Sequence, residues 1–345
     1  MQDHSSTTVL VTGANGFIAT HCILQLLQQG YCVRGTLRNL ARQVEIRQML
    51  AKHVDAQARL EFVSVDLLKD DGWDAAVRGC EFVLHVASPV PVAEPKNEND
   101  LILPARDGTL RVLRAAAANG VRRVVYTSSI AAVFEGYTTR KHTFDESNWS
   151  NLDESIGAYA RSKTLAEQAA WAFVKNLKAK QPLELAVIIP GYVLGPCLSA
   201  DVTTSGQLIY RLLRGEVPGI PQMYWPIVDV RDVAAAHIAA MTAPEAAGQR
   251  FCCAGESYWA QDVAQILARH FAGKNYKITT RQIPDLFMRL IALVDPTTRL
   301  SINWLGREYR LANAKLKTTL GWSPRPVEET IIEMAESMIS LGMIN

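Results

Sequence analysis

Cysteines are few in this sequence, and no two of them have a metal-binding or redox spacing. Of 345 residues six are cysteines, and none form a Cys-x-x-Cys pair. Such pairs are typical of structural zinc sites and thioredoxin-type redox motifs. We therefore expect no metal site, and reduced cysteines that pack as small apolar side chains. They are Cys22, Cys32, Cys80, Cys197, Cys252 and Cys253.

Charge of one sign and long apolar runs are also lacking. Lysine and arginine number 36 against 34 acidic residues, for a net charge of +2, which lacks the basic excess of a nucleic-acid binder. Apolar runs such as 286–294 are far shorter than the roughly 20 residues that span a bilayer. The polar start, Met1 to Thr8, does not resemble a secretory signal. We expect a cytoplasmic protein without nucleic-acid or membrane partners.

The order of apolar segments predicts an α/β fold. Short β-rich runs alternate with longer helical ones along the first half of the chain, which is typical of a Rossmann-type doubly wound parallel sheet with helices on both faces. The expected strands are 8–12, 31–37, 60–65, 82–87, 123–127 and 185–189, and the expected helices are 16–29, 42–52, 72–77, 99–118 and 157–178.

The alternation fades after Pro190, where segments rich in glycine and proline begin. A length of 345 residues corresponds to about two domains. We predict an NADP-binding Rossmann domain over 1–190, to which 227–253 returns, and a smaller C-terminal α/β substrate-binding lobe over 191–345.

A glycine-rich loop, TGANGFIA, stands between the first expected strand and the first helix. A residue without Cβ permits the tight turn and the approach of a pyrophosphate, and the following helix presents free N–H groups to the phosphates. Two glycines alone are weak evidence, but their place in a βαβ unit favours nucleotide binding. The predicted contacts are Gly13, Asn15, Gly16, Phe17 and Ile18.

Arginines follow where an NAD enzyme carries an acidic residue. The segment VRGTLRN contains Arg34 and Arg38, and no carboxylate occurs before Glu45. A guanidinium at the end of the second strand suits a 2′-phosphate, which favours NADP(H), and Arg42 adds a further positive charge. The alternative is that these are solvated loop arginines.

Asp66 and Leu67 follow the third expected strand, where an adenine contact is made in such folds. Asp66 is equally typical of a helix N-cap. Both readings stay open from the sequence.

Three polar side chains are candidates for chemistry. Tyr159 and Lys163 are four residues apart in a helical run and so share one face. A nearby ammonium lowers the pKa of a tyrosine from its usual value of about 10. Ser128 and Ser129 end the strand before that helix, at the ligand edge of a doubly wound sheet.

In order along the chain, the motifs TGANGFIA, YTSS, YARSK, PGYVLGP and DVRDVA resemble the extended short-chain dehydrogenase/reductases. LRN, HVASPV, YARSKTLAEQAAW and WSPRP are similar to the dihydroflavonol reductase and yeast aldehyde or methylglyoxal reductase group, over nearly the whole chain. This resemblance implies Tyr159 as the acid/base, Lys163 as its tuning residue and ribose ligand, Ser129 as the carbonyl-binding serine and Arg38 as the 2′-phosphate ligand. It also implies that the cofactor is lined by Val86, Ala87, Ser88, Thr127, Tyr159, Lys163, Pro190 and Val193.

The function expected from these residues is NADPH-dependent reduction of a ketone or aldehyde, with a bulky hydrophobic or aromatic substrate. Tyr192 stands where sugar-nucleotide epimerases carry an asparagine, and Phe134 does not recreate the polar residue of flavonoid reductases. A hydroxysteroid-type dehydrogenase, a nucleotide-sugar epimerase and a non-catalytic NADP-sensing protein stay as alternatives, as do a homodimer and a monomer. Candidate pocket walls are Tyr192, Tyr210, Met223, Tyr224 and Trp225.

Overall fold

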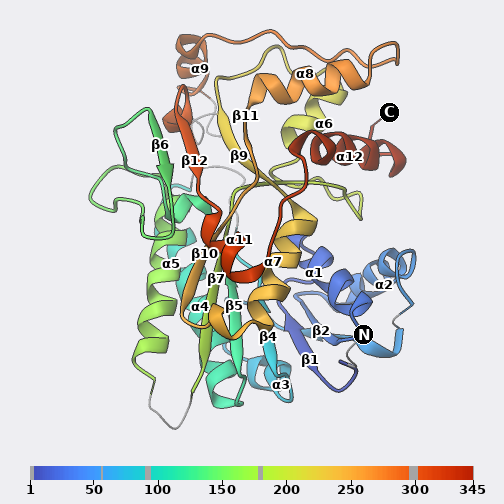
Figure 1. The fold of residues 1–345 in the computed structure, drawn as a ribbon, viewed down its shortest axis with the longest axis vertical. Helices are drawn as coiled ribbons and strands as arrows, with labels where there is room; N and C mark the ends of the chain where they lie inside the picture. Colours follow the sequence, from blue (N-terminus) through green and yellow to red (C-terminus); the bar gives the residue numbers. More distant parts are fainter. Residues whose placement is uncertain (1–3, 56, 90–94, 178–181, 295–301, 345) are drawn as a thin grey trace.

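A seven-stranded parallel sheet forms the centre of the computed structural model, which describes residues 4–55, 57–89, 95–177, 182–294 and 302–344 (Figure 1). The strand order is β10-β7-β5-β4-β1-β2-β3, and every pair is parallel. The predicted doubly wound fold is confirmed. The strands are β1 Thr8–Val11, β2 Cys32–Leu37, β3 Leu60–Ser64, β4 Phe82–His85, β5 Arg123–Thr127, β7 Glu184–Pro190 and β10 Gln249–Cys253.

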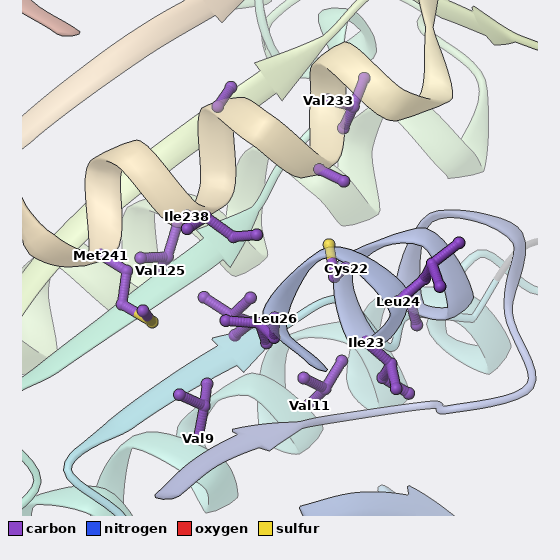
Figure 2. Packing of buried hydrophobic residues seen from close by; sticks show 14 of the residues in the cluster. Val9, Val11, Cys22, Ile23, Leu24, Leu26, Val125, Val233, Ile238 and Met241 are labelled. Carbon is purple, nitrogen blue, oxygen red and sulfur yellow. The ribbon is translucent and has the colours of Figure 1, made fainter. Parts of the chain in front are cut away.

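Helices cover both faces of this sheet because successive strand residues point to opposite sides. Val9 and Val11 pack toward α1 and α7, whereas Leu10 between them belongs to the core of the other face. Figure 2 shows the first of these layers, with Val233 and Ile238 of α7 above the residues of α1. One face carries α1 Phe17–Gln28, α2 Gln43–Ala51 and α7 Val230–Thr242; the other carries α3 Trp73–Val77, α4 Asn99–Ala118 and α5 Ala158–Lys175. Lys178, the predicted end of the last helix, lies outside the described residues.

A second core lies beyond the carboxyl ends of the strands, in the upper part of Figure 1. A small sheet of order β11-β9-β8 packs there against three helices. Its strands are β8 Tyr192–Leu194, β9 Tyr224–Asp229 and β11 Ser257–Trp259, and the helices are α6 Gln207–Leu213, α8 Ala260–His270 and α12 Val327–Ser340. The other helices and turns described are α9 Asp285–Ile291, α11 Ala314–Leu320, η1 Leu40–Arg42, η2 Gln57–Arg59, η3 Ile130–Ala132, η4 Pro244–Ala246 and η5 Ile302–Trp304.

The chain crosses back to the large sheet after residue 229. α7 packs on α1, and β10 pairs with β7 at the sheet edge. Residues 227–229, at the start of the segment expected to return, instead belong to β9 of the small sheet. A further parallel pair that was not expected joins β6 Lys141–Phe144 to β12 Glu308–Leu311. The division into domains at residue 190 stays a prediction.

Two observations concern special chemistry and membranes. Five of the cysteines are buried and Cys32 is half-buried, all as free thiols. Within the described ranges, no group of three or more His, Cys, Asp or Glu side chains could hold a metal ion. Nor does that part of the chain contain a helix with the length and apolar character needed to cross a membrane.

Candidate active site

The site lies where the strand order reverses, at the carboxyl edge between β1 and β4. Thr12, directly after β1, holds the two loops together there: its hydroxyl oxygen accepts hydrogen bonds from the N–H groups of Val86 at 3.0 Å and Ala87 at 2.9 Å. It also bonds Nδ1 of His85 at 2.9 Å. Ligands bind doubly wound sheets at such a switch point.

Gly13 brings bare backbone to this edge. Its φ is +70°, and a Cβ there would meet the Cβ of Ala87 at 3.0 Å. Its N–H donates to the Thr36 hydroxyl at 3.0 Å, which fixes the turn before Gly16 begins α1. The cradle has no room for a side chain, and the first N–H groups of a twelve-residue helix follow it. It therefore fits the dinucleotide phosphates expected from the sequence.

The three arginines of the next strand and the loop after it differ in what they contact. Arg34 lies within β2 and binds Glu61 at 2.5 Å and the carbonyl oxygens of Ala76 and Arg78, both at 2.8 Å. The hypothesis that Arg34 serves a 2′-phosphate is therefore wrong, because its guanidinium is held beside α3. Arg42 pairs with Glu45 and Asp201 on the surface. Arg38 is exposed directly after β2.

Asp66 and Leu67 follow β3 as expected. The Asp66 carboxylate accepts the Leu68 N–H at 3.0 Å, so it closes a turn. Leu67 packs under α4, where a Cβ at Gly108 would meet the Leu67 Cβ at 3.1 Å. Both residues border the same carboxyl edge as Gly13, two strands further along the sheet.

Ser129, Tyr159 and Lys163 come together at the ends of β5 and α5. Ser129 follows β5, caps η3 by accepting the Ala131 N–H at 3.2 Å, and hydrogen-bonds Tyr159. Tyr159 is partly buried against Ala131 and Ile156. The Lys163 Nζ lies 5.8 Å from the centre of the Tyr159 ring. The structure thus brings together all three residues that the resemblance assigns to catalysis.

Burial dominates the electrostatics of this group. It raises the pKa of Tyr159, and the hydrogen bond from Ser129 opposes that rise. It lowers the pKa of Lys163 to about 8, although the negative charge of the Glu167 carboxylate acts to raise it. The influence that lowers the Tyr159 pKa is therefore Ser129, and the tuning by Lys163 stays a prediction.

The two serines of YTSS have different surroundings. Ser128 is buried, and its hydroxyl donates to Glu167 at 2.5 Å. Ser129 is half-buried on the Tyr159 side. Ser129 is thus the serine that faces Tyr159.

Apart from Tyr159 and Lys163, the predicted lining residues lie in three places. Val86, Ala87 and Ser88 continue from β4 beside Gly13 and are half-buried. Thr127 is different, since its hydroxyl is bound to Nε2 of His237 at 2.7 Å beneath α7. The remaining two, Pro190 and Val193, lie where β7 passes into β8.

The aromatic residues expected to wall a pocket belong largely to the second core. Tyr192 and Trp225 stack with ring centroids 4.4 Å apart, and the Tyr192 hydroxyl donates to the Ser205 carbonyl at 2.8 Å. Met223 and Tyr210 are in the same cluster. Tyr224 packs instead against Trp259.

Sequence reasoning missed Glu167 and Arg250. Glu167 lies one turn after Lys163 on α5, fully buried, and pairs with Arg250 of β10 at 2.6 Å. A signal existed, because positions 159, 163 and 167 repeat every four residues on one helix face. The partner on β10 had no signal, since 83 residues separate it from Glu167.

Comparisons with known proteins agree with this geometry. Residues 9–254 match the model of the NAD dependent epimerase/dehydratase family. The chain belongs to this family. Among its relatives, cinnamoyl-CoA reductase 1 of Petunia hybrida is 35% identical over 99% of this chain and 95% of the relative. The NADPH-dependent methylglyoxal reductase of Saccharomyces cerevisiae is 31% identical, over 96% of this chain and 98% of the relative.

This member of the epimerase/dehydratase family has the same fold as reductases of known structure. The yeast methylglyoxal/isovaleraldehyde reductase complexed with NADPH superposes with a TM-score of 0.81 at 31% identity, covering 97% of this chain and 99% of that one. The resemblance to the methylglyoxal reductase group is confirmed.

Proposed function

We propose that the chain is an NADPH-dependent carbonyl reductase that converts a ketone or aldehyde to an alcohol. The convergence of Ser129, Tyr159 and Lys163 at the edge that carries the Gly13 loop is the observation that carries this proposal. Relatives named as reductases of methylglyoxal and cinnamoyl-CoA support the reaction type.

Each residue of the site has a distinct task. Bound NADPH supplies the hydride. The Gly13 loop and the start of α1 hold the phosphates, Arg38 binds the 2′-phosphate, and Lys163 holds the nicotinamide ribose. Ser129 donates a hydrogen bond to the carbonyl oxygen, where negative charge develops. The Tyr159 hydroxyl donates the proton to that oxygen.

The proposal extends to the substrate class, the cellular location and the oligomeric state. We infer a bulky hydrophobic or aromatic substrate, because the second core next to Tyr192 is apolar. A cytoplasmic location, a homodimer through α4 and α5, and the roles given to the lining residues are predictions of the same proposal.

Replacing the tyrosine tests the mechanism. In Tyr159→Phe the proton donor is lost, so NADPH oxidation with a carbonyl substrate should fall at least about 100-fold. The assay follows NADPH absorbance against an aromatic diketone, an aliphatic aldehyde, a dihydroflavonol and a 3-ketosteroid. Binding of NADPH, measured by its fluorescence, should change little.

The matched control is Tyr31→Phe, which removes a hydroxyl before β2 at the opposite edge of the sheet. It should retain wild-type turnover. Wild-type turnover by a folded Tyr159→Phe variant would exclude the proposed proton donor. Tight NADPH binding with no oxidation by any carbonyl in the panel would exclude the reductase function.

A further inference from the structure

The geometry points to Glu167 as a positioning residue of the proposed reductase site, because its buried carboxylate hydrogen-bonds Ser128 at the end of β5 and lies one helical turn after Lys163 on α5. Tyr159, Lys163 and Glu167 follow one another at intervals of four residues along α5. Glu167 has no exposed surface. The inference rests on the proposed function only for its kinetic readout.

Four donors surround the Glu167 carboxylate. Oε1 accepts from Nε of Arg250 at 2.6 Å and from the Trp171 indole N–H at 3.1 Å. Oε2 accepts from the Ser128 hydroxyl at 2.5 Å and from Nη2 of Arg250 at 3.3 Å. Two donors on each oxygen satisfy the hydrogen-bonding capacity of the carboxylate, and they offset the cost of burying it.

The contact with Ser128 fixes the chain at the point where the site begins. The Ser128 N–H donates to the Ile188 carbonyl at 2.8 Å, and its hydroxyl is held by Glu167. The backbone N–H and the hydroxyl of Ser128 are therefore both held in hydrogen bonds. The next residue, Ser129, consequently leaves the strand in a set direction, and that direction brings its hydroxyl to Tyr159.

Arg250 prevents the carboxylate from turning away. Its Nη1 donates to the carbonyl oxygens of Glu146 at 2.7 Å and Asn148 at 3.0 Å. Its guanidinium lies 3.7 Å from the centre of the Trp149 ring. Because these contacts hold the arginine in place, the position of Glu167 is determined by β10 as well as by α5.

The charge of Glu167 acts on Lys163. Burial lowers the pKa of Lys163 to about 8, and the Glu167 carboxylate raises it. The titratable groups that face Lys163 from β4 and β5 are neutral near pH 7, since burial lowers the pKa of His85 to about 3 and raises that of Tyr126. Arg250 on β10 is charged and lies on the far side of the Glu167 carboxylate, with which it pairs. Tyr159 also stays neutral, since its pKa is raised. Glu167 therefore keeps the buried amine an ammonium, in the form that binds a ribose and balances a developing oxyanion.

The ionisation of Lys163 can be measured in the chain without cofactor. We would follow the pH dependence of Lys163 acetylation by acetic anhydride, with mass spectrometry of the peptide that contains it. Side chains four residues apart on a helix have Cβ atoms about 5–6 Å apart, and opposite charges at such a separation, with an effective dielectric near 20, correspond to about one to two pH units. In Glu167→Gln the titration of Lys163 should move toward acid by about that amount. An unmoved titration in the folded variant overturns the inference.

The matched control is Glu184→Gln. Glu184 also pairs with a buried arginine, Arg123 at 2.7 Å, but at the opposite end of β5 and β7. It should reproduce any general loss of stability and leave the Lys163 titration in place. If it moves that titration equally, the effect is structural and the inference fails.

A double variant covers the case in which Glu167→Gln alone does not fold. Glu167→Gln with Arg250→Gln removes both charges and keeps hydrogen-bonding groups of similar shape, so no arginine is left unpaired. A merely structural ion pair predicts a normal Lys163 titration in this variant. The positioning role predicts a shift toward acid that persists but is smaller than in Glu167→Gln, because the Arg250 charge that repels the Lys163 ammonium is lost as well.

Kinetics separate this inference from the proposed function. If the wild type reduces carbonyls, the alkaline limb of its kcat profile should move toward acid in the Glu167 variants, with a loss in kcat larger than the change in KM for NADPH. If the wild type reduces none, the proposed function fails. The acetylation result then still decides whether Glu167 sets the ionisation of Lys163.

Discussion

Arg34 and Arg38 show that a residue's place within or after a strand decides what its side chain can bind. Arg34 lies inside β2, where neighbouring strands and α3 supply carbonyl and carboxylate partners for its guanidinium. Arg38 comes one residue after the strand ends and is exposed at the carboxyl edge. Because Arg38 lies outside the ladder at the edge where a phosphate would bind, we predict that the NADPH preference depends on Arg38.

Replacing Arg38 should change cofactor preference. A charge-assisted bond to a 2′-phosphate contributes about 1.5–3 kcal/mol, or about 10-fold to 100-fold in affinity. In Arg38→Gln the KM for NADPH should therefore rise at least about 10-fold, while NADH kinetics change little. Arg42→Gln is the control, because Arg42 already pairs with Glu45 and Asp201. An equal loss with NADH and NADPH would contradict the role of Arg38.

At the scale of elements, the two sheets meet where β7 passes into β8. Gly191 separates these strands, and a Cβ on it would lie 2.1 Å from the carbonyl oxygen of Pro226 in β9. Its N–H donates to the Cys253 carbonyl at 2.9 Å at the end of β10. One residue therefore contacts both sheets through its backbone, and it couples the edge that carries Pro190 to the second core.

Gly191→Ala should separate these strands. Because the clash is with backbone, no side-chain rotation can relieve it, and we expect a loss of about 3 kcal/mol or more in the free energy of unfolding. Gly120→Ala is the control: it has a φ of +72° but nothing within 4 Å of its Cβ position, so it should cost only about 1 kcal/mol. Urea unfolding measures both. Equal costs would show that the close approach contributes nothing.

Across the whole molecule, local sequence patterns predicted the strands of the large sheet. They did not predict the contacts between residues that are distant in sequence. Strands such as Phe82–His85 are buried throughout, so composition alone marks them. The strand Lys141–Phe144 has three exposed residues of four and pairs with a segment more than 160 positions away. Tyr159 and Lys163 could be found from helical spacing, whereas the Glu167–Arg250 pair depends on β10 reaching the sheet edge, which only the tertiary fold determines.

The whole fold also buries histidines that must stay neutral, which makes its stability depend on pH. Burial lowers the pKa of His21 to about 4, of His85 to about 3 and of His237 to about 4. In the unfolded chain a histidine has a pKa near 6.5, so below that pH the unfolded state binds protons that the folded state does not, and stability falls as pH falls. Glu135 acts in the opposite sense, because burial raises its folded pKa to about 7.

Three histidines outweigh one glutamate, so the folded state should lose a few kcal/mol, on the order of 3 kcal/mol, between pH 7 and pH 5. The urea midpoint at the two pH values measures this loss. In His237→Gln an amide replaces the imidazole between Thr127 and the Val233 carbonyl. That variant should lose less stability on acidification, because one buried group no longer excludes a proton. A midpoint that is the same at both pH values in the wild type would mean that the histidines take up protons without unfolding, and that their buried positions open to water.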